Sequence, residues 1–298
     1  MLNEELRHLR GIGMAIELIR NKWTYAVLVA LLDGSMSPTE LLVHINKGNV
    51  RNADLLNEWV LHEKTLLETL RRLEGEGLIV RQQLVEPQVK SAARRLTSMS
   101  EELLEALHEP AVWATRHADL LLANLRVRRG VGSAGPAPAR RLKFEGGKRT
   151  PSQERWRNLG VALTMLRLRW SFSVIASLRN GPMRPTELAL VINEDVDRDR
   201  HITGRRHLSD KVLWGTLRRL STDGVIEHEG RGPGFASAAH CSLTDSGHDL
   251  LVALAPLGVW AVRHEEWLVD IMRARLRRSG NPSADRQSPD GSSGTVAW

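Results

Sequence analysis

Apolar residues recur at helical spacing in several stretches of the chain, and turn residues separate these stretches. The first stretch, Leu18–Leu32, ends at Asp33-Gly34, and glycine is the usual residue just past a helix end. Ser37 followed by Pro38 predicts the start of a second helix, with Ser37 as its N-cap. A third helix is indicated by apolar residues at i, i+4 and i+7, namely Leu66, Leu70 and Leu73.

Short apolar segments follow the third helix. Gly77-Leu78-Ile79-Val80 leaves the helix through a glycine and predicts one strand, and a second short strand ends at Leu96-Thr97. A polar loop joins them, so the two strands form a β-ribbon. Thr97 then predicts the N-cap of a long last helix. Three helices, a ribbon and a further helix are typical of a winged helix-turn-helix domain, whose third helix can enter the DNA major groove.

This series of predicted elements occurs twice along the chain. A shift of 147 residues superimposes residues 13–129 on residues 160–276 without a gap, which predicts an internal duplication. The units are too long and too few for a solenoid. In the second copy Ser209 is a candidate N-cap, whereas Arg184 replaces Ser37 and weakens that cap. Identical pairs include Trp23 and Trp170, Gly34 and Gly181, Pro38-Thr39-Glu40-Leu41 and Pro185-Thr186-Glu187-Leu188, Thr69-Leu70-Arg71-Arg72-Leu73 and Thr216-Leu217-Arg218-Arg219-Leu220, and Trp113 and Trp260.

The domain organisation follows from this repeat. We expect a winged helix-turn-helix unit over residues 1–129, a basic Gly/Pro-rich linker over 130–155, a second unit over 156–277 and a disordered tail over 278–298. The predicted fold class is mainly α with small β-wings, with the two winged helix-turn-helix domains arranged as a covalent pseudo-dimer.

Both units resemble the HxlR-type bacterial regulators, a family of winged helix-turn-helix proteins. Unit two carries that family's pattern at Trp170, Gly181, Glu187-Leu188, Leu208-Ser209-Asp210-Lys211-Val212-Leu213, Leu217-Arg218, Gly224-Val225 and Leu243-Thr244. Unit one carries it at Trp23, Gly34, Glu40-Leu41, Leu61, Lys64, Leu66, Leu70-Arg71, Gly77-Leu78 and Leu96-Thr97. Both units depart from it by about a dozen extra residues between the second and third helices, within 46–60 and 193–207.

The resemblance implies a sequence-specific DNA-binding transcriptional regulator with double-stranded DNA as its partner. Family members pair as homodimers through terminal helices, so two units on one chain imply a monomeric pseudo-dimer, with a homodimer as the alternative. Because half-sites mirror protein symmetry, we expect an imperfect inverted repeat as the target.

The distribution of charge along the chain bears on where DNA contacts are expected. The formal net charge of +7 suggests a polyanionic partner. Residues 13–129, however, carry 15 basic and 15 acidic side chains, and residues 160–276 carry 15 basic and 14 acidic side chains. Residues 130–159 carry 7 basic and 2 acidic side chains, so most of the excess positive charge belongs to the predicted linker. DNA binding by the units must therefore depend on the local placement of their cations.

The predicted DNA contacts lie on the third helices and the wings. They are Lys64, Thr65, Thr69, Arg71, Arg72, Arg94 and Arg95 in unit one, and Ser209, Lys211, Thr216, Arg218 and Arg219 in unit two. The acids Glu63, Glu68 and Asp210 would face phosphates unfavourably. The linker is expected to supply a basic DNA-contacting arm, or else only a soluble tether, through Arg140, Arg141, Lys143, Lys148 and Arg149.

Tryptophan supports an alternative function. Trp59, Trp214 and Trp267 have no Trp counterpart in the other unit, and flat aromatic ligands stack on such rings. The alternative is a small-molecule-binding protein, either a drug-sequestering or resistance protein or a ligand-responsive regulator, with a Trp-lined cavity between the units. Ordinary packing is the competing explanation for these side chains.

Other chemistry is sparse in this sequence. It contains no phosphate-binding glycine loop, nucleophile elbow or HExxH motif, so we expect no enzyme, no cofactor and no metal site. Cys241 is the single cysteine and is expected to be an inert packing residue. No run of 18 apolar residues occurs and the N-terminal segment is charged, which favours a cytoplasmic protein without a membrane partner.

Overall fold

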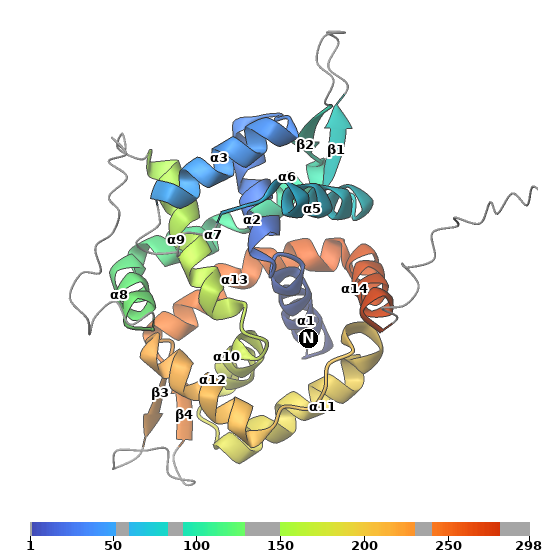
Figure 1. Cartoon of the computed structure of the whole chain (residues 1–298). Coiled ribbons are helices and arrows are strands. Elements are labelled where there is room, and N and C mark those ends of the chain that lie inside the picture. The colour runs from blue at the N-terminus through green and yellow to red at the C-terminus, as the bar shows by residue number, and fades with distance from the viewer. Residues whose placement is uncertain (1, 52–59, 83–91, 129–149, 230–239, 281–298) are drawn as a thin grey trace, which may run out of the picture.

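The two halves of the chain contain matching series of helices and strands (Figure 1). The computed structural model describes residues 2–51, 60–82, 92–128, 150–229 and 240–280. The first half contains α1 (Leu2–Leu18), α2 (Lys22–Ala30), α3 (Pro38–Arg51), α5 (Glu63–Gly75), β1 (Ile79–Gln82), β2 (Ala93–Leu96), α6 (Ser98–Ala106), α7 (His108–Arg116) and α8 (Ala118–Arg128). The second half contains α9 (Pro151–Leu166), α10 (Ser171–Ser177), α11 (Pro185–Thr203), α12 (Asp210–Thr222), β3 (Ile226–Glu229), β4 (His240–Leu243), α13 (Asp245–Arg263) and α14 (Glu265–Gly280).

The helix predicted over Leu18–Leu32 is wrong at its start. α1 ends at Leu18, and α2 begins at Lys22 because the Asn21 side chain accepts a hydrogen bond from the Trp23 backbone N–H. The predicted end holds, since a short 3₁₀ turn over Leu31–Asp33 passes into Gly34 at φ +123°. Asn was overlooked as a cap because the apolar spacing runs across it.

The second helices begin as predicted, but their caps differ. At α3 the Glu40 backbone N–H donates to Ser37 Oγ and the Ser37 N–H donates to the Glu40 carboxylate, at 3.3 and 2.7 Å. At α11 the Arg184 N–H donates to the Glu187 carboxylate at 2.9 Å, which corresponds to the bond from the Ser37 N–H to Glu40. The bond to the serine hydroxyl has no counterpart there, because Arg184 replaces Ser37. Ser209 occupies the N-cap position of α12 as expected, yet its side chain makes no capping hydrogen bond.

The predicted β-ribbons are confirmed, and they have the same register. Ile79 pairs with Leu96 in the first ribbon, and Ile226 pairs with Leu243 in the second. Each ribbon is followed by a threonine N-cap, because Thr97 and Thr244 accept from the backbone N–H groups three residues later.

Gly77 and Gly224 make the turn from the third helix into each ribbon. Their φ angles are +73° and +72°, a left-handed conformation that glycine adopts without the steric cost of a Cβ. The threonines that cap the following helices, Thr97 and Thr244, also donate their hydroxyl protons to the carbonyls of these glycines. The third helix, the ribbon and the last helix are therefore joined at one point in each half.

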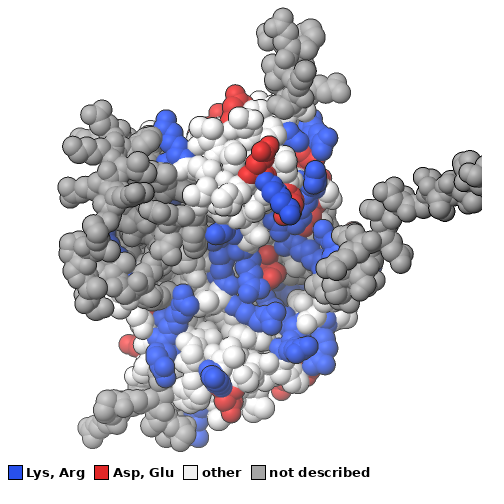
Figure 2. All heavy atoms as spheres, in the orientation of Figure 1, with Lys and Arg blue, Asp and Glu red and all other residues white. Residues whose placement is uncertain are grey.

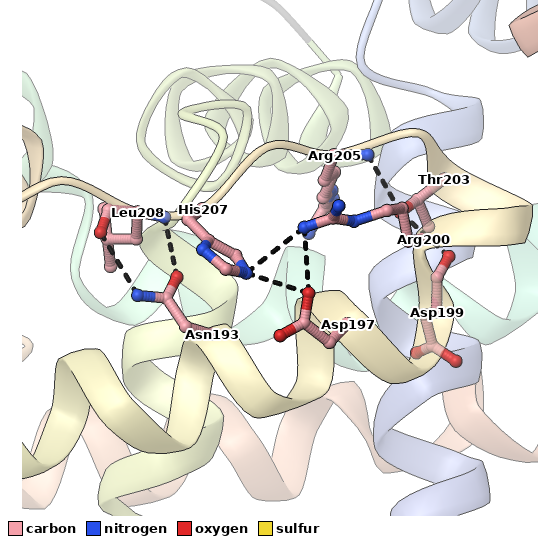
Figure 3. Close-up of polar contacts among 8 residues, drawn as sticks. All are labelled: Asn193, Asp197, Asp199, Arg200, Thr203, Arg205, His207 and Leu208. Carbon is pink, nitrogen blue, oxygen red and sulfur yellow. Dashed lines mark hydrogen bonds and ion pairs between the residues drawn. The ribbon is translucent and has the colours of Figure 1, made fainter.

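The extra residues between the second and third helices are largely helical in the second half. α11 runs to Thr203 and ends where Gly204 adopts φ +59°. A single side chain then fixes the return of the chain, because Asn193 accepts from the Leu208 N–H at 2.7 Å and donates to its carbonyl (Figure 3). Asn46 and Leu61 make the same two bonds in the first half.

The two halves pack through matching helices. α1 lies against α13, and α9 lies against α7. The Trp113 indole N–H donates to the Ser246 carbonyl at 3.0 Å, and that of Trp260 donates to the Met99 carbonyl at 3.2 Å. Positions 113 and 260 correspond in the repeat, as do 99 and 246, so the two bonds are reciprocal. Buried apolar side chains from both halves join in a single core cluster.

Two predicted boundaries shift in the structure. α9 begins at Pro151, inside the range predicted as linker, because Thr150 caps it together with Gln153. α14 continues to Gly280, past the predicted start of the tail. In both places a helix extends the expected unit.

Candidate nucleic-acid interface

Four cations stand exposed on the third helices. Lys64 and Arg71 project from α5, and Lys211 and Arg218 project from α12 at corresponding positions. Both helices bury their leucine stripes, so these side chains occupy the solvent face. Arg95 adds an exposed cation on strand β2, while Thr65 is half-buried and Ser209 is exposed.

Three of the predicted contact residues lie inside the protein instead. Thr69 and Thr216 are buried, and each donates its hydroxyl proton to a carbonyl four residues earlier, at 2.8 Å. Arg94 is also buried: it pairs with Glu74 at 3.0 Å and donates to the Ala92 carbonyl at 2.6 Å. The prediction that these side chains contact DNA is wrong for this conformation, because their polar groups point to internal partners.

The second arginine of each Arg-Arg pair turns inward. Arg72 is half-buried and donates to the Thr24 hydroxyl at 2.5 Å. Burial lowers the pKa of Arg72, which nearby Glu76 raises in part. Arg219 is half-buried, burial lowers its pKa, and its Nε has no hydrogen-bond partner among the described residues. The first arginine of each pair, Arg71 or Arg218, is the exposed one.

Acidic side chains share this surface. Glu63, Glu68 and Asp210 are all exposed on α5 and α12, as the sequence predicted. Arg81 on β1 is paired with Glu74 at 2.9 Å and is partly neutralised. Burial tends to raise the pKa of Glu74, but hydrogen bonds from Arg81 and Arg94 outweigh it, so the pKa is lowered overall. The candidate interface is therefore a set of separate cations and not a continuous basic patch.

Each third helix is held in place by the opposite half. The Arg275 guanidinium of α14 binds the buried Glu76 carboxylate just after α5, at 2.7 and 2.8 Å, and the Trp267 indole N–H donates to the Glu76 carbonyl. In turn, Asn124 of α8 donates to the Thr222 carbonyl at the end of α12, at 2.6 Å. The spacing of the two third helices thus depends on contacts between the halves.

Some predicted site residues fall outside the described residues. These are Trp59 in the first insertion and the linker cations Arg140, Arg141, Lys143, Lys148 and Arg149. Of the remaining tryptophans, Trp214 is half-buried in α12, and Trp267 packs edge-on against Trp260 with ring centroids 6.1 Å apart.

A cavity of about 1210 Å³ does lie between the halves, but its lining is different from the predicted one. Helices α1, α10, α11 and α14 contribute to its wall, and the wall contains no tryptophan. The prediction that Trp214 and Trp267 line a cavity between the units is wrong for this cavity. Nine arginines line it instead: Arg7, Arg10, Arg20, Arg167, Arg169, Arg179, Arg198, Arg205 and Arg275.

Sequence reasoning missed this arginine lining. The one available signal was that Arg20 and Arg167 occupy corresponding positions of the repeat and would meet if the halves pair symmetrically. The remaining arginines come from elements whose order along the chain does not show that they meet.

Cys241 is buried in β4, and burial raises the pKa of its thiol, so the unreactive thiol form is favoured. Within the described ranges, no single helix is long and apolar enough to cross a membrane, although α9 and Ser171–Asn180 together, bent by 83°, reach that length and composition.

Comparison with known proteins finds one family. Residues 38–121 match the model of the HxlR-like helix-turn-helix family. The matched segment runs from α3 to the start of α8 and contains α5 and the first ribbon. This segment is similar to that family of DNA-binding regulators. No curated protein and no solved structure matches the chain.

Proposed function

We propose that this protein is a sequence-specific DNA-binding transcriptional regulator that acts as a covalent pseudo-dimer. The observation that carries the proposal is the match of residues 38–121 to an HxlR-like helix-turn-helix, with α5 presenting exposed Lys64 and Arg71. In this fold the third helix enters the major groove, and its exposed side chains read bases or bind phosphates.

The pseudo-dimer is supported by the reciprocity of the contacts between the halves. In a two-fold pair the same patch is used by both subunits, so residue i contacts j and j contacts i. The Trp113–Ser246 and Trp260–Met99 bonds have this form. The packing of Phe172 near Gly13 and of Tyr25 near Gly160 has it too, again at positions related by the repeat.

A pseudo-dimer presents two third helices from one chain. Its target is then an inverted repeat, because the cations on α5 and α12 occupy equivalent positions of the two units. The repeat is imperfect because the ribbons differ: Arg95 on β2 is replaced by Ser242 at the equivalent position on β4. The five charged linker residues Arg140, Arg141, Lys143, Lys148 and Arg149 are proposed as an additional backbone-binding arm.

Electrophoretic mobility shift with genomic fragments from around the protein's own gene tests the proposal. A specific complex should persist near physiological salt, and Arg71→Ala and Arg218→Ala should each weaken it about tenfold, since a phosphate or base contact is worth roughly 1–3 kcal/mol. Arg126→Ala on α8 is the control, because Arg126 is also exposed but lies on neither α5 nor α12.

The salt dependence separates two explanations. Binding that appears only at low salt, is indifferent to sequence and disappears when residues 139–150 are deleted would mean that the basic linker alone attracts DNA. In that case the regulator proposal fails.

A further inference from the structure

The cavity between the halves has two ends that differ in charge balance. At one end each arginine has a carboxylate partner: Arg7 and Arg10 pair with Glu265, Arg179 pairs with Glu5, and Arg198 pairs with Asp195. These ion pairs neutralise that end, and they join α1 to α14 and to the turn that follows α10.

At the other end four arginines line the cavity wall, and one carboxylate pairs with two of them. We call Arg20, Arg167, Arg169 and Arg205 the arginine cluster. Glu17 pairs with Arg20 at 3.0 Å and with Arg205 at 3.5 Å. In the part of the chain that the structure describes, no other carboxylate forms an ion pair with these four residues. The cluster therefore retains an excess of positive charge.

The environment of the cluster makes this excess costly. Arg167 has a buried Nε without a hydrogen-bond partner among the described residues, its guanidinium lies 6.0 Å from the centroid of the Tyr25 ring, and desolvation lowers its pKa to about 10. Burial also lowers the pKa of Arg205; Glu17 opposes this change, while Arg169 and Arg20 add to it. Arg205, Arg169 and Arg20 repel one another, and guanidiniums in this position are stabilised when an anion with several oxygens binds between them.

The chain holds the cluster in place through rigid elements. Arg20 donates from Nε to the Arg167 carbonyl at 3.1 Å, which joins the end of α1 to the end of α9. Arg205 follows the left-handed Gly204, and its backbone N–H donates to Thr203 Oγ1 at 3.4 Å (Figure 3). Figure 2 shows Lys and Arg side chains gathered across the middle of this face of the molecule, over the region of α1 in Figure 1.

Apolar side chains complete the wall. Leu9, Phe172 and Leu276 line the cavity together with the arginines. The volume of about 1210 Å³ exceeds what a single inorganic ion fills and leaves room for an organic ligand. An apolar wall beside a strong positive centre fits a ligand that has both an anionic group and an apolar body.

We propose that this cavity binds a small organic polyanion, with its charged groups on Arg20, Arg167, Arg169 and Arg205 and its apolar body against Leu9 and Phe172. Phosphate and multiple carboxylate groups share the oxygen geometry that guanidiniums recognise. The site is independent of the candidate DNA interface, and its binding is measured without DNA, so the two proposals can fail separately.

Binding of two probes to the full-length protein tests the proposal. Pyrophosphate, followed by calorimetry, reports the anionic subsite; 8-anilinonaphthalene-1-sulfonate, followed by its fluorescence, reports an anion with an apolar body. Both should bind with a Kd below roughly 1 mM near physiological salt, and pyrophosphate should displace the dye. Arg169→Gln should weaken both about tenfold, the loss expected for one charge-assisted contact.

The control is Arg206→Gln, since Arg206 is exposed next to Arg205 in the chain but does not line the cavity. Arg169→Gln should also leave the thermal midpoint unchanged or raise it, because it removes repulsion and no ion pair. The proposal is overturned if neither probe binds, or if both variants lose binding equally. It is also overturned if Arg169→Gln weakens only the binding of a DNA duplex, which would make the cluster a DNA backbone contact.

Discussion

Neighbouring residues with the same chemistry have different roles in this protein. Arg94 and Arg95 are adjacent on β2, and both were predicted to contact DNA. Strand alternation places successive side chains on opposite faces, so Arg94 is buried against Glu74 while Arg95 faces solvent. The Arg71 and Arg72 pair on α5 divides in the same way, because consecutive helical positions lie on different faces. Residue type predicted which side chains are cationic, but the face of the helix or strand on which each one lies decides which of them are exposed to solvent.

This difference gives a paired test of stability and DNA affinity. Arg94→Ala removes one partner of a mostly buried ion pair and should lower the free energy of unfolding by about 2–4 kcal/mol. Arg95→Ala removes an exposed side chain, should change that free energy by less than about 0.5 kcal/mol and should weaken DNA binding. Urea unfolding and mobility shift on the same two variants measure both quantities. Equal stability losses would contradict the assignment of Arg94 to the interior.

The individual elements were largely predictable because their signals are local. The ribbons, the third helices and the threonine caps follow from apolar spacing, glycines and capping residues within a few positions. The break at Asn21 was missed because apolar spacing continues on both sides of it. The helical extension of α11 was also missed, since its residues 193–203 are mostly polar and charged, and its stability comes partly from packing against α14.

The end of α11 provides a test at this scale. Gly204 adopts φ +59°, and a Cβ there would meet the tip of Leu276 on α14. Gly204→Ala should lower the free energy of unfolding by about 1–2 kcal/mol, because a side chain is disfavoured in the left-handed conformation.

Gly215→Ala is the matched control of opposite sign. Gly215 lies exposed within α12, and a Cβ there would meet nothing within 4 Å. Alanine should raise the free energy of unfolding by about 0.5–1 kcal/mol through helix propensity. Urea unfolding measures both variants. A stabilising Gly204→Ala would mean that α11 does not end in this conformation.

For the whole molecule, the charge is organised differently from what composition suggested. The near-zero net charge of each half conceals an uneven distribution: ion pairs lie at one end of the cavity, and a cluster of four arginines with a single paired carboxylate, Glu17, lies at the other. The cluster combines residues 20, 167, 169 and 205, which come together only when α1 and α11 pack beside the end of α9. A sequence without related sequences to compare reveals the repeat, but it does not reveal which surfaces the two copies press together.

The pairing of the halves leads to a last prediction, that the covalent link is not what holds them together. If a protease site is inserted between Gly135 and Pro136 and cleaved, the two fragments should elute together as a 1:1 complex, because helices from both halves share one apolar core. Gly11→Leu should separate them, since a Cβ at Gly11 would lie 2.8 Å from Ala261 Cβ where α1 meets α13. Gly75→Leu should not, because a Cβ at Gly75 meets nothing within 4 Å. Size-exclusion chromatography with light scattering distinguishes these outcomes. Separation of the wild-type fragments would mean that α1, α7, α9 and α13 are held together only at the high local concentration that the intact chain imposes.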